Sequence, residues 1–160
     1  MLLPKEFLNI HCHGRDFNQR HKSTLEEVLS ESQESHIGST IFMPNTDPPL
    51  TDVETLAQYY SIIRGNCEKL HVKEPQYIYF GLTDDNLDQF DQALDLPYVV
   101  GGKCYPKKDG QGVTTGSDIG VSKNTSILSA MRKARRKNKA IAFHCDDPWI
   151  IAIEGNSINA

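Results

Sequence analysis

Residues 39–54 read STIFMPNTDPPLTDVE and combine a strand pattern, a rigid turn and a helix start. The apolar and β-branched residues at its beginning predict a strand over residues 39–43. Pro44 ends that strand because proline has no backbone N–H for the hydrogen-bond ladder. Thr51, with Glu54 three residues later, has the pattern of a capping box and predicts that a helix begins there. The stretch therefore reads as one β/α unit.

The same alternation of strand and helix continues on both sides of this stretch. Strand patterns cover residues 7–13, 39–43, 77–82, 98–103 and 140–145. Two helical patterns begin at the capping boxes of Ser23 and Thr51, and two more cover residues 86–94 and 124–137. The order predicts a parallel sheet covered by helices, either an open doubly wound sheet or part of a (β/α)8 barrel. In both folds, functional residues collect at the carboxyl ends of the strands.

Length and charge limit the class of protein. The 160 residues are enough for one domain, spanning 1–160, that buries about 70% of the surface exposed by its unfolded chain. The formal net charge of −4, from 17 basic and 21 acidic residues, gives no reason to expect a nucleic-acid partner. A small anionic substrate would need a local basic group instead.

Neither a membrane span nor a secretory signal is evident. No run of residues approaches the roughly 18 apolar residues that a membrane span needs, so we expect a cytoplasmic protein without a membrane partner. The four cysteines lack CxxC spacing, which favours reduced thiols. We expect three of them, Cys12, Cys104 and Cys145, to be small buried residues on tightly packed strands.

The last helical pattern ends in the basic run RKARRK at residues 132–137. Cations are favoured at a helix carboxyl end, so a solvated helix end is a better interpretation than a nucleic-acid patch. Ile127, Leu128, Met131 and Ala134 occur at helical spacing and predict the apolar face of this helix.

Two histidines and an arginine occur where the first strand ends. Side chains two residues apart on a strand point to the same face, so His11 and His13 can reach one metal ion. Two ordinary histidines that happen to alternate are an equally good interpretation. Arg15 follows on the same side and suits bidentate capture of a carboxylate, although it could equally form a surface salt bridge.

The proline-rich turn places Asn45 at the end of the second strand. Pro44 stops strand pairing, while Pro48 and Pro49 stiffen the exit toward the next helix. Such rigidity holds the polar amide in place at a small entropic cost. A polar side chain held in this way is typical of a functional site, with a purely structural turn as the alternative.

Lys103 and His144 close the fourth and fifth strands. A lysine directed into apolar surroundings favours the neutral amine, which can react with carbon dioxide to give a carbamate. A lysine that extends to the rim is the alternative for Lys103, and a hydrogen-bonded core histidine is the alternative for His144. Their common position at strand ends, shared with His11 and His13, favours one functional centre.

Four motifs in this order, HCHGRD, MPNTDPPLT, GGKCYP and FHCDD, resemble those of dihydroorotases in the amidohydrolase superfamily. The resemblance extends to LTDD after the third strand and to the loop at residues 112–115. It implies an α/β, TIM-barrel-like (β/α)8 metal-dependent hydrolase fold. The chain would provide about the first five β/α units, the amino-terminal half.

The resemblance also implies an activity and a set of roles. Dihydroorotases interconvert dihydroorotate and N-carbamoyl-L-aspartate in de novo pyrimidine biosynthesis with a binuclear zinc centre. By motif, His11 and His13 would bind one zinc ion, carboxylated Lys103 would bridge both ions, and His144 would bind the second. Arg15 and Asn45 would hold the substrate carboxylate.

The sequence departs from the family pattern at its carboxyl end. A further histidine and a catalytic aspartate of the family have no counterpart before Ala160. We therefore expect this chain to be inactive alone and to need a partner, either a missing carboxyl-terminal half or further copies in a homo-oligomer.

Two other functions are compatible with the same residues. A dihydropyrimidinase or hydantoinase would use the same metal ligands, although Arg15 and Asn45 would be wasted on an uncharged ring. A non-catalytic assembly protein could instead pair the open edges of a half barrel with a partner. The apolar segment WIIAI at residues 149–153 could serve such a contact.

Overall fold

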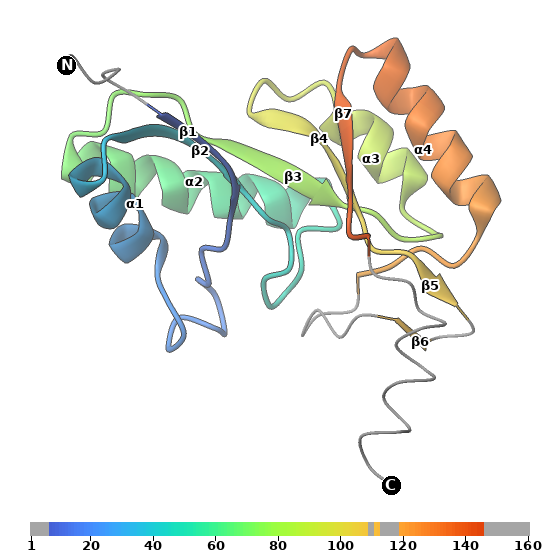
Figure 1. Ribbon diagram of the computed structural model, residues 1–160, viewed down its shortest axis with the longest axis horizontal. Helices are drawn as coiled ribbons and strands as arrows, with labels where there is room; N and C mark the ends of the chain where they lie inside the picture. The colour runs from blue at the N-terminus through green and yellow to red at the C-terminus, as the bar shows by residue number, and fades with distance from the viewer. Residues whose placement is uncertain (1–6, 109–110, 113–118, 146–160) are drawn as a thin grey trace, which may run out of the picture.

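The computed structural model describes residues 7–108, 111–112 and 119–145. Five parallel strands form one curled sheet in the order β1-β2-β3-β4-β7, which confirms the predicted partial barrel (Figure 1). Their bounds are β1 Phe7–Cys12, β2 Ile37–Phe42, β3 Tyr77–Gly81, β4 Val99–Cys104 and β7 Ala140–Phe143. A small antiparallel pair, β5 Lys107–Lys108 and β6 Gln111–Gly112, follows β4 and was not predicted.

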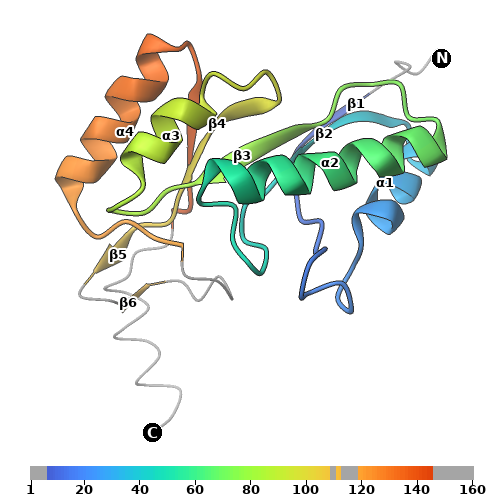
Figure 2. The same cartoon turned by 180° about the vertical axis from the view of Figure 1, so that it is seen from behind.

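Four helices lie on one face of this sheet, as the two opposite views show (Figures 1 and 2). Their bounds are α1 Leu25–Glu34, α2 Val53–Leu70, α3 Leu87–Ala93 and α4 Asn124–Arg136. The opposite, concave face of the sheet carries no helix in the described part of the chain (Figure 1). None of these helices has both the length and the apolar character needed to cross a bilayer.

The first two helices begin one residue later than predicted. Thr24, rather than Ser23, caps α1, since its hydroxyl accepts from Glu27 N at 3.1 Å while the Glu27 carboxylate accepts from Thr24 N at 2.7 Å. Asp52, rather than Thr51, caps α2 and accepts from the backbone N–H three residues later at 2.8 Å. In each case the capping residue has the extended backbone that directs its oxygen toward the first helical turn.

The hydrophobic core fills the space between the helices and the sheet. Phe42 and Phe80 on the strands meet Tyr59 of α2 and Phe90 of α3 there, and all four are fully buried. Because side chains alternate along a strand, the neighbours of these residues face the concave side.

The predicted apolar face of α4 is partly wrong. Ala134 is buried and Ile127 is partly buried against the core, as expected. Leu128 and Met131, however, are 51% and 45% exposed, and Ala130 is buried in their place. The small alanines allow α4 to approach the sheet closely, which turns the larger residues outward. The basic end of the helix is paired with α3, where Lys133 lies 3.4 Å from Asp91.

Burial of the strand cysteines varies with their position in the sheet. Cys104 on the interior strand β4 is buried, and Cys12 on the edge strand β1 is partly buried. Cys145 is exposed, so the expectation that all three are buried is wrong for the two at the edges.

Apolar side chains are exposed at both edges of the sheet. Leu8 and Ile10 of β1 and Phe143 of β7 are exposed, each on an edge strand. The predicted contact segment at residues 149–153 lies outside the described residues.

Candidate functional site

The predicted site residues project from the concave face at the carboxyl ends of the strands. Cys12 and Cys104 pack against the helix-side core. His11 and His13 flank Cys12, and Lys103 precedes Cys104, so their side chains point to the other face.

The two histidines of β1 are in contact. Their Nε2 atoms are 3.3 Å apart, and their ring centroids are 5.2 Å apart. Desolvation, followed by the charge of Arg15, lowers the pKa of His13 to about 4. Desolvation also lowers the pKa of His11, with smaller contributions from Lys103 and His144. Both imidazoles are therefore neutral at pH 7.

Asn45 and Arg15 meet beside this histidine pair. Asn45 is only 6% exposed, and its neighbours assign the orientation of its side-chain amide. The amide nitrogen faces His13 Nδ1 at 2.9 Å, and the amide oxygen accepts from the two Arg15 Nη atoms at 3.2 and 3.3 Å. Arg15 Nη1 also donates to the Asn45 backbone oxygen and, at 3.2 Å, to Gln19 Oε1. The pair that was predicted to hold a carboxylate is thus adjacent.

The proline-rich turn is braced by its own hydrogen bonds. Leu50 N donates to Pro44 O at 3.0 Å, and the Thr46 hydroxyl donates to Pro48 O at 2.7 Å. The peptide bond between Asp47 and Pro48 is cis. These bonds hold the loop that carries Asn45.

Gly14, between His13 and Arg15, packs against the first two helices. The hydroxyl of Tyr59 on α2 donates to Gly14 O at 2.9 Å. A Cβ atom at Gly14 would lie 2.5 Å from Leu25 Cδ2, so the loop approaches α1 too closely for a side chain. Sequence reasoning missed both contacts, which join residues far apart in the chain.

Lys103 is 3% exposed and does not extend to the rim. Desolvation lowers its pKa, which favours the neutral amine. Its Nζ atom lies 5.1 Å from the centroid of the Tyr105 ring. No carboxylate within the described ranges forms an ion pair with it.

Tyr105 is a further residue of the site that was not predicted. Its ring lies 5.4 Å from the ring of His144, and burial raises the pKa of its hydroxyl to about 12. Main-chain pairing fixes His144 near this point, since His144 N donates to Cys104 O at 2.9 Å. Tyr105 follows Lys103 by two residues, so strand alternation could have identified it.

The described residues fit one corner of a zinc site but not a complete centre. Two nitrogens bound to one tetrahedral zinc ion lie roughly 3.3 Å apart, which matches the separation of the two Nε2 atoms. Zinc usually takes at least three protein ligands. Over residues 7–108, 111–112 and 119–145, no group of three or more His, Cys, Asp or Glu side chains could hold a metal ion. The structure thus brings His11 and His13 together without a third ligand of these types.

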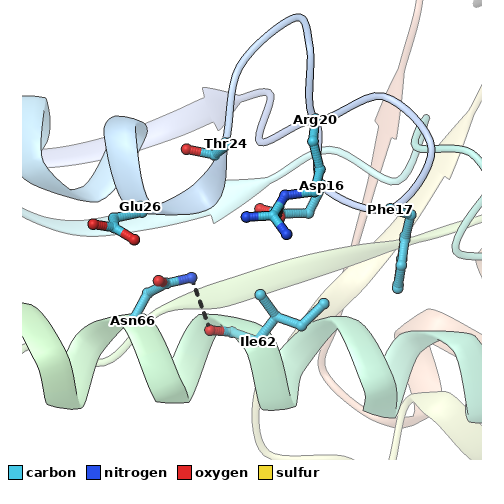
Figure 3. A pocket seen from close by; sticks show the side chains of 7 residues that line it. All are labelled: Asp16, Phe17, Arg20, Thr24, Glu26, Ile62 and Asn66. Atoms are coloured by element: carbon cyan, nitrogen blue, oxygen red, sulfur yellow. Dashed lines mark hydrogen bonds and ion pairs between the residues drawn. The ribbon is translucent and has the colours of Figure 1, made fainter.

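A hollow of about 310 Å³ lies elsewhere, between the loop after β1 and helix α2 (Figure 3). Its polar groups are satisfied within the protein, because Arg20 pairs with Asp16 at 3.3 Å and Asn66 Nδ2 donates to Ile62 O at 3.1 Å. We assign it a structural role.

Comparison with known proteins identifies relatives along most of the chain. No family model matches the sequence. A dihydroorotase from Shewanella putrefaciens is 32% identical over 134 residues, covering 84% of this chain and 36% of the relative. A dihydroorotase from Streptococcus pneumoniae is 27% identical over 155 residues, covering 95% of this chain and 32% of the relative. The chain therefore spans about a third of the length of these curated relatives.

Solved structures agree at the level of the fold. Dihydroorotase from Saccharomyces cerevisiae, in complex with 5-fluoroorotic acid, superposes with a TM-score of 0.71 at 23% identity, covering 90% of this chain and 37% of that one. L-hydantoinase (dihydropyrimidinase) from Arthrobacter aurescens gives a TM-score of 0.76 at 17% identity, covering 95% and 32%. In sequence and in fold, the chain resembles the amino-terminal half of a dihydroorotase, as the four strand-end motifs predict.

Proposed function

We propose that this chain provides the carboxylate-binding part of a dihydroorotase, which interconverts dihydroorotate and N-carbamoyl-L-aspartate in pyrimidine biosynthesis. The observation that carries the proposal is the contact between Arg15 and the Asn45 amide beside a neutral histidine pair. An arginine that faces an amide oxygen can exchange this weak acceptor for a carboxylate, which forms a stronger charge-assisted bond.

The metal site of the proposed enzyme uses zinc. His11, His13, carboxylated Lys103 and His144 are the residues that would hold it, with Lys103 as the catalytic residue. The chemistry that bound zinc supplies is activation of water for attack on an amide carbonyl. The buried position and lowered pKa of Lys103 are compatible with carboxylation, since the neutral amine reacts with carbon dioxide.

A charged substrate is favoured over an uncharged one. Arg15 is held by two acceptors, the Asn45 backbone oxygen and Gln19, and a planar guanidinium fixed in this way suits bidentate capture of a carboxylate. Hydantoin and dihydrouracil lack the carboxylate that dihydroorotate carries. The fold likeness to L-hydantoinase does not distinguish the two substrates, because both enzymes share this architecture.

We further propose that residues 1–160 form one partial barrel domain that is inactive without additional strands. The exposed apolar residues Leu8, Ile10 and Phe143 at the two edges support a need for a partner. This partner is the carboxyl-terminal half of a barrel or another copy of the chain. Non-catalytic assembly is the alternative function for the same edges.

Three measurements on the isolated chain test this proposal. Zinc content per chain and molecular mass in solution establish metal occupancy and pairing, and a well-behaved monomer would refute the need for a partner. Turnover of N-carbamoyl-L-aspartate with added zinc should be absent. Any zinc-dependent turnover would refute the proposed inactivity but leave the substrate assignment in place.

In an enzyme completed by a partner half, Arg15→Met separates the two substrate classes. It should reduce turnover of dihydroorotate far more than turnover of uncharged hydantoins. Equal losses for both would favour a hydantoinase.

A further inference from the structure

Apolar side chains are exposed where helix α4 meets the edge strand β7. Leu128 and Met131 of α4 are exposed, and Phe143 of β7 keeps 38% of its surface accessible. The other three described helices expose no large apolar side chain. We call Leu128, Met131 and Phe143 the α4–β7 face.

The apolar residues of α4 lie on its flank away from α3. Successive residues of an α-helix are rotated by about 100°. Measured from the buried Ala130, Met131 lies about 100° to one side, whereas Lys133 lies about 60° to the other. Lys133 faces α3, where it pairs with Asp91 at 3.4 Å. Because α4 is the outermost described helix at this end of the sheet, its other flank borders the edge at β7 (Figure 2).

Strand β7 directs Phe143 toward the same layer. Phe143 is aligned with Cys104 of β4, and Ile141 is aligned with Gly102. Aligned residues of parallel strands point to the same side of the sheet. Cys104 and Ile141 both pack against the core on the helix side. Phe143 therefore points to the layer that contains α4, which packs against both β4 and β7.

The chain leaves the sheet beside this face. Strand β7 follows α4 after a short connection at residues 137–139 and runs back along it, so its carboxyl end lies near the first turns of α4 (Figure 1). Each of the four preceding strands of the sheet is followed by a helix on this side, and such crossovers are almost always right-handed. The same direction after Cys145 brings the chain to the α4–β7 face.

The next apolar segment in the sequence fits this position. Residues 149–153 read WIIAI. Only residues 146–148 separate them from Cys145, which is a usual length for a connection between a strand and a helix. When extended, this connection can span roughly 13 Å, enough to pass from the sheet to the helix layer.

Charge favours the same contact. Residues 146–160 contain three acidic residues and neither lysine nor arginine. On the exposed surface of α4, Arg132 and Arg135 form no ion pair with any described residue. An acidic segment lying along α4 would place opposite charges beside these arginines.

We propose that residues 149–153 pack on the α4–β7 face, so that the chain itself covers the outer side of its last described strand. The short tether favours this segment over a second copy, since it acts at an effective concentration on the order of mM. The hydrogen-bonding edges of β7 and β1 remain for a partner. The proposal does not rest on the proposed function, because neither zinc nor substrate takes part.

Trp149 is the only tryptophan in the sequence, so its fluorescence reports on this segment alone. In the 160-residue chain, its emission should be blue-shifted from that of the urea-unfolded chain. Leu128→Glu places a charge on the α4–β7 face and should shift the emission to the unfolded value. Leu8→Glu is the matched control, because Leu8 is similarly exposed but lies on β1 at the other end of the sheet. It should leave the emission unchanged.

Hydrogen exchange followed by mass spectrometry separates local release from unfolding. Residues 149–153 should exchange slowly in wild type and as fast as an unfolded chain in Leu128→Glu, while β3 stays protected in both. If Leu128→Glu also loses protection in β3, Met131→Gln is the milder change on the same face and should release residues 149–153 alone.

Three results would overturn the proposal. The first is wild-type emission equal to that of the unfolded chain. The second is unchanged protection of residues 149–153 in a folded α4 variant. The third is emission that depends on protein concentration and responds to Leu8→Glu, which would identify β1 of a second copy as the surface that Trp149 contacts.

Discussion

Gly14→Ala should destabilise the protein because the site loop lies directly against the first two helices. The added Cβ would lie 2.5 Å from Leu25 Cδ2 and 2.8 Å from the Tyr59 hydroxyl, whereas ordinary contact begins at 3.4 Å. Neither neighbour can move into solvent, since Leu25 and Tyr59 are fully buried. The loop or helix α1 must therefore shift by almost 1 Å, which is the difference between the ordinary contact distance of 3.4 Å and the 2.5 Å available.

Overpacking of this kind costs about 1–3 kcal/mol of unfolding free energy. For a chain of this length, a loss of about 2 kcal/mol lowers Tm by roughly 4–8 °C. Gly65→Ala is the matched control, because nothing lies within 4 Å of a Cβ at this exposed position in α2. The same substitution there should stabilise the protein by about 0.5–1 kcal/mol, since glycine is unfavourable inside a helix.

Urea unfolding followed by circular dichroism measures both variants against wild type. The expected result is opposite signs for Gly14→Ala and Gly65→Ala. If Gly14→Ala is as stable as wild type, the loop between His13 and Arg15 is not packed as described, and the geometry of the site is wrong.

Three other substitutions test separate parts of the structure. Tyr59→Phe removes the hydroxyl that donates to Gly14 O, and should cost about 1–2 kcal/mol by urea unfolding; a neutral result would contradict that contact. Lys103→Met replaces a buried amine with an apolar chain, so unfolding free energy should stay the same or rise, and a loss above about 1 kcal/mol would contradict its apolar setting. Burial raises the pKa of Asp84, but hydrogen bonds, beginning with that from Ser122 N, outweigh it and leave the pKa lowered. The ionised Asp84 carboxylate therefore stabilises the folded protein above the unfolded-state pKa of 3.8, and this stabilisation is lost as the pH falls through the lower folded-state pKa. The substitution Asp84→Asn should therefore lower the free energy of unfolding at pH 7 and have a much smaller effect at pH 3.

The order of strands and helices could be predicted from the sequence. All five main strands were predicted because each is an apolar run bounded by turn residues, and their parallel order follows from the helices between them. Helix starts were one residue early, since Ser23 and Thr24 are both good caps and only the backbone decides which one faces the helix. The exposed face of α4 was missed because periodicity alone cannot tell whether Leu128 or Ala130 meets the sheet.

For the candidate site, the sequence identified which residues lie at the strand ends but not which side chains they contact. Strand alternation places His11 and His13 on one face, and the structure brings their Nε2 atoms together. The Tyr59 hydroxyl and the direction of the Asn45 amide depend on contacts between distant segments, which a local pattern does not encode. Asp146 and Asp147 of the fourth motif lie outside the described residues.

Selective recognition of a carboxylate by Arg15 is the central claim, and a pair of ligands tests it most directly. L-dihydroorotate and dihydrouracil share a ring and differ by the carboxylate, so their affinities for the zinc-treated chain can be compared by NMR titration. Loss of charge-assisted hydrogen bonds worth about 1.5–3 kcal/mol corresponds to roughly 10–100-fold in Kd. Arg15→Met should weaken dihydroorotate binding by that factor and leave the affinity for dihydrouracil unchanged. Arg20→Met is the control, because Arg20 pairs with Asp16 rather than with Asn45. Equal binding of the two ligands to wild type, or equal effects of Arg15→Met and Arg20→Met, would contradict the account.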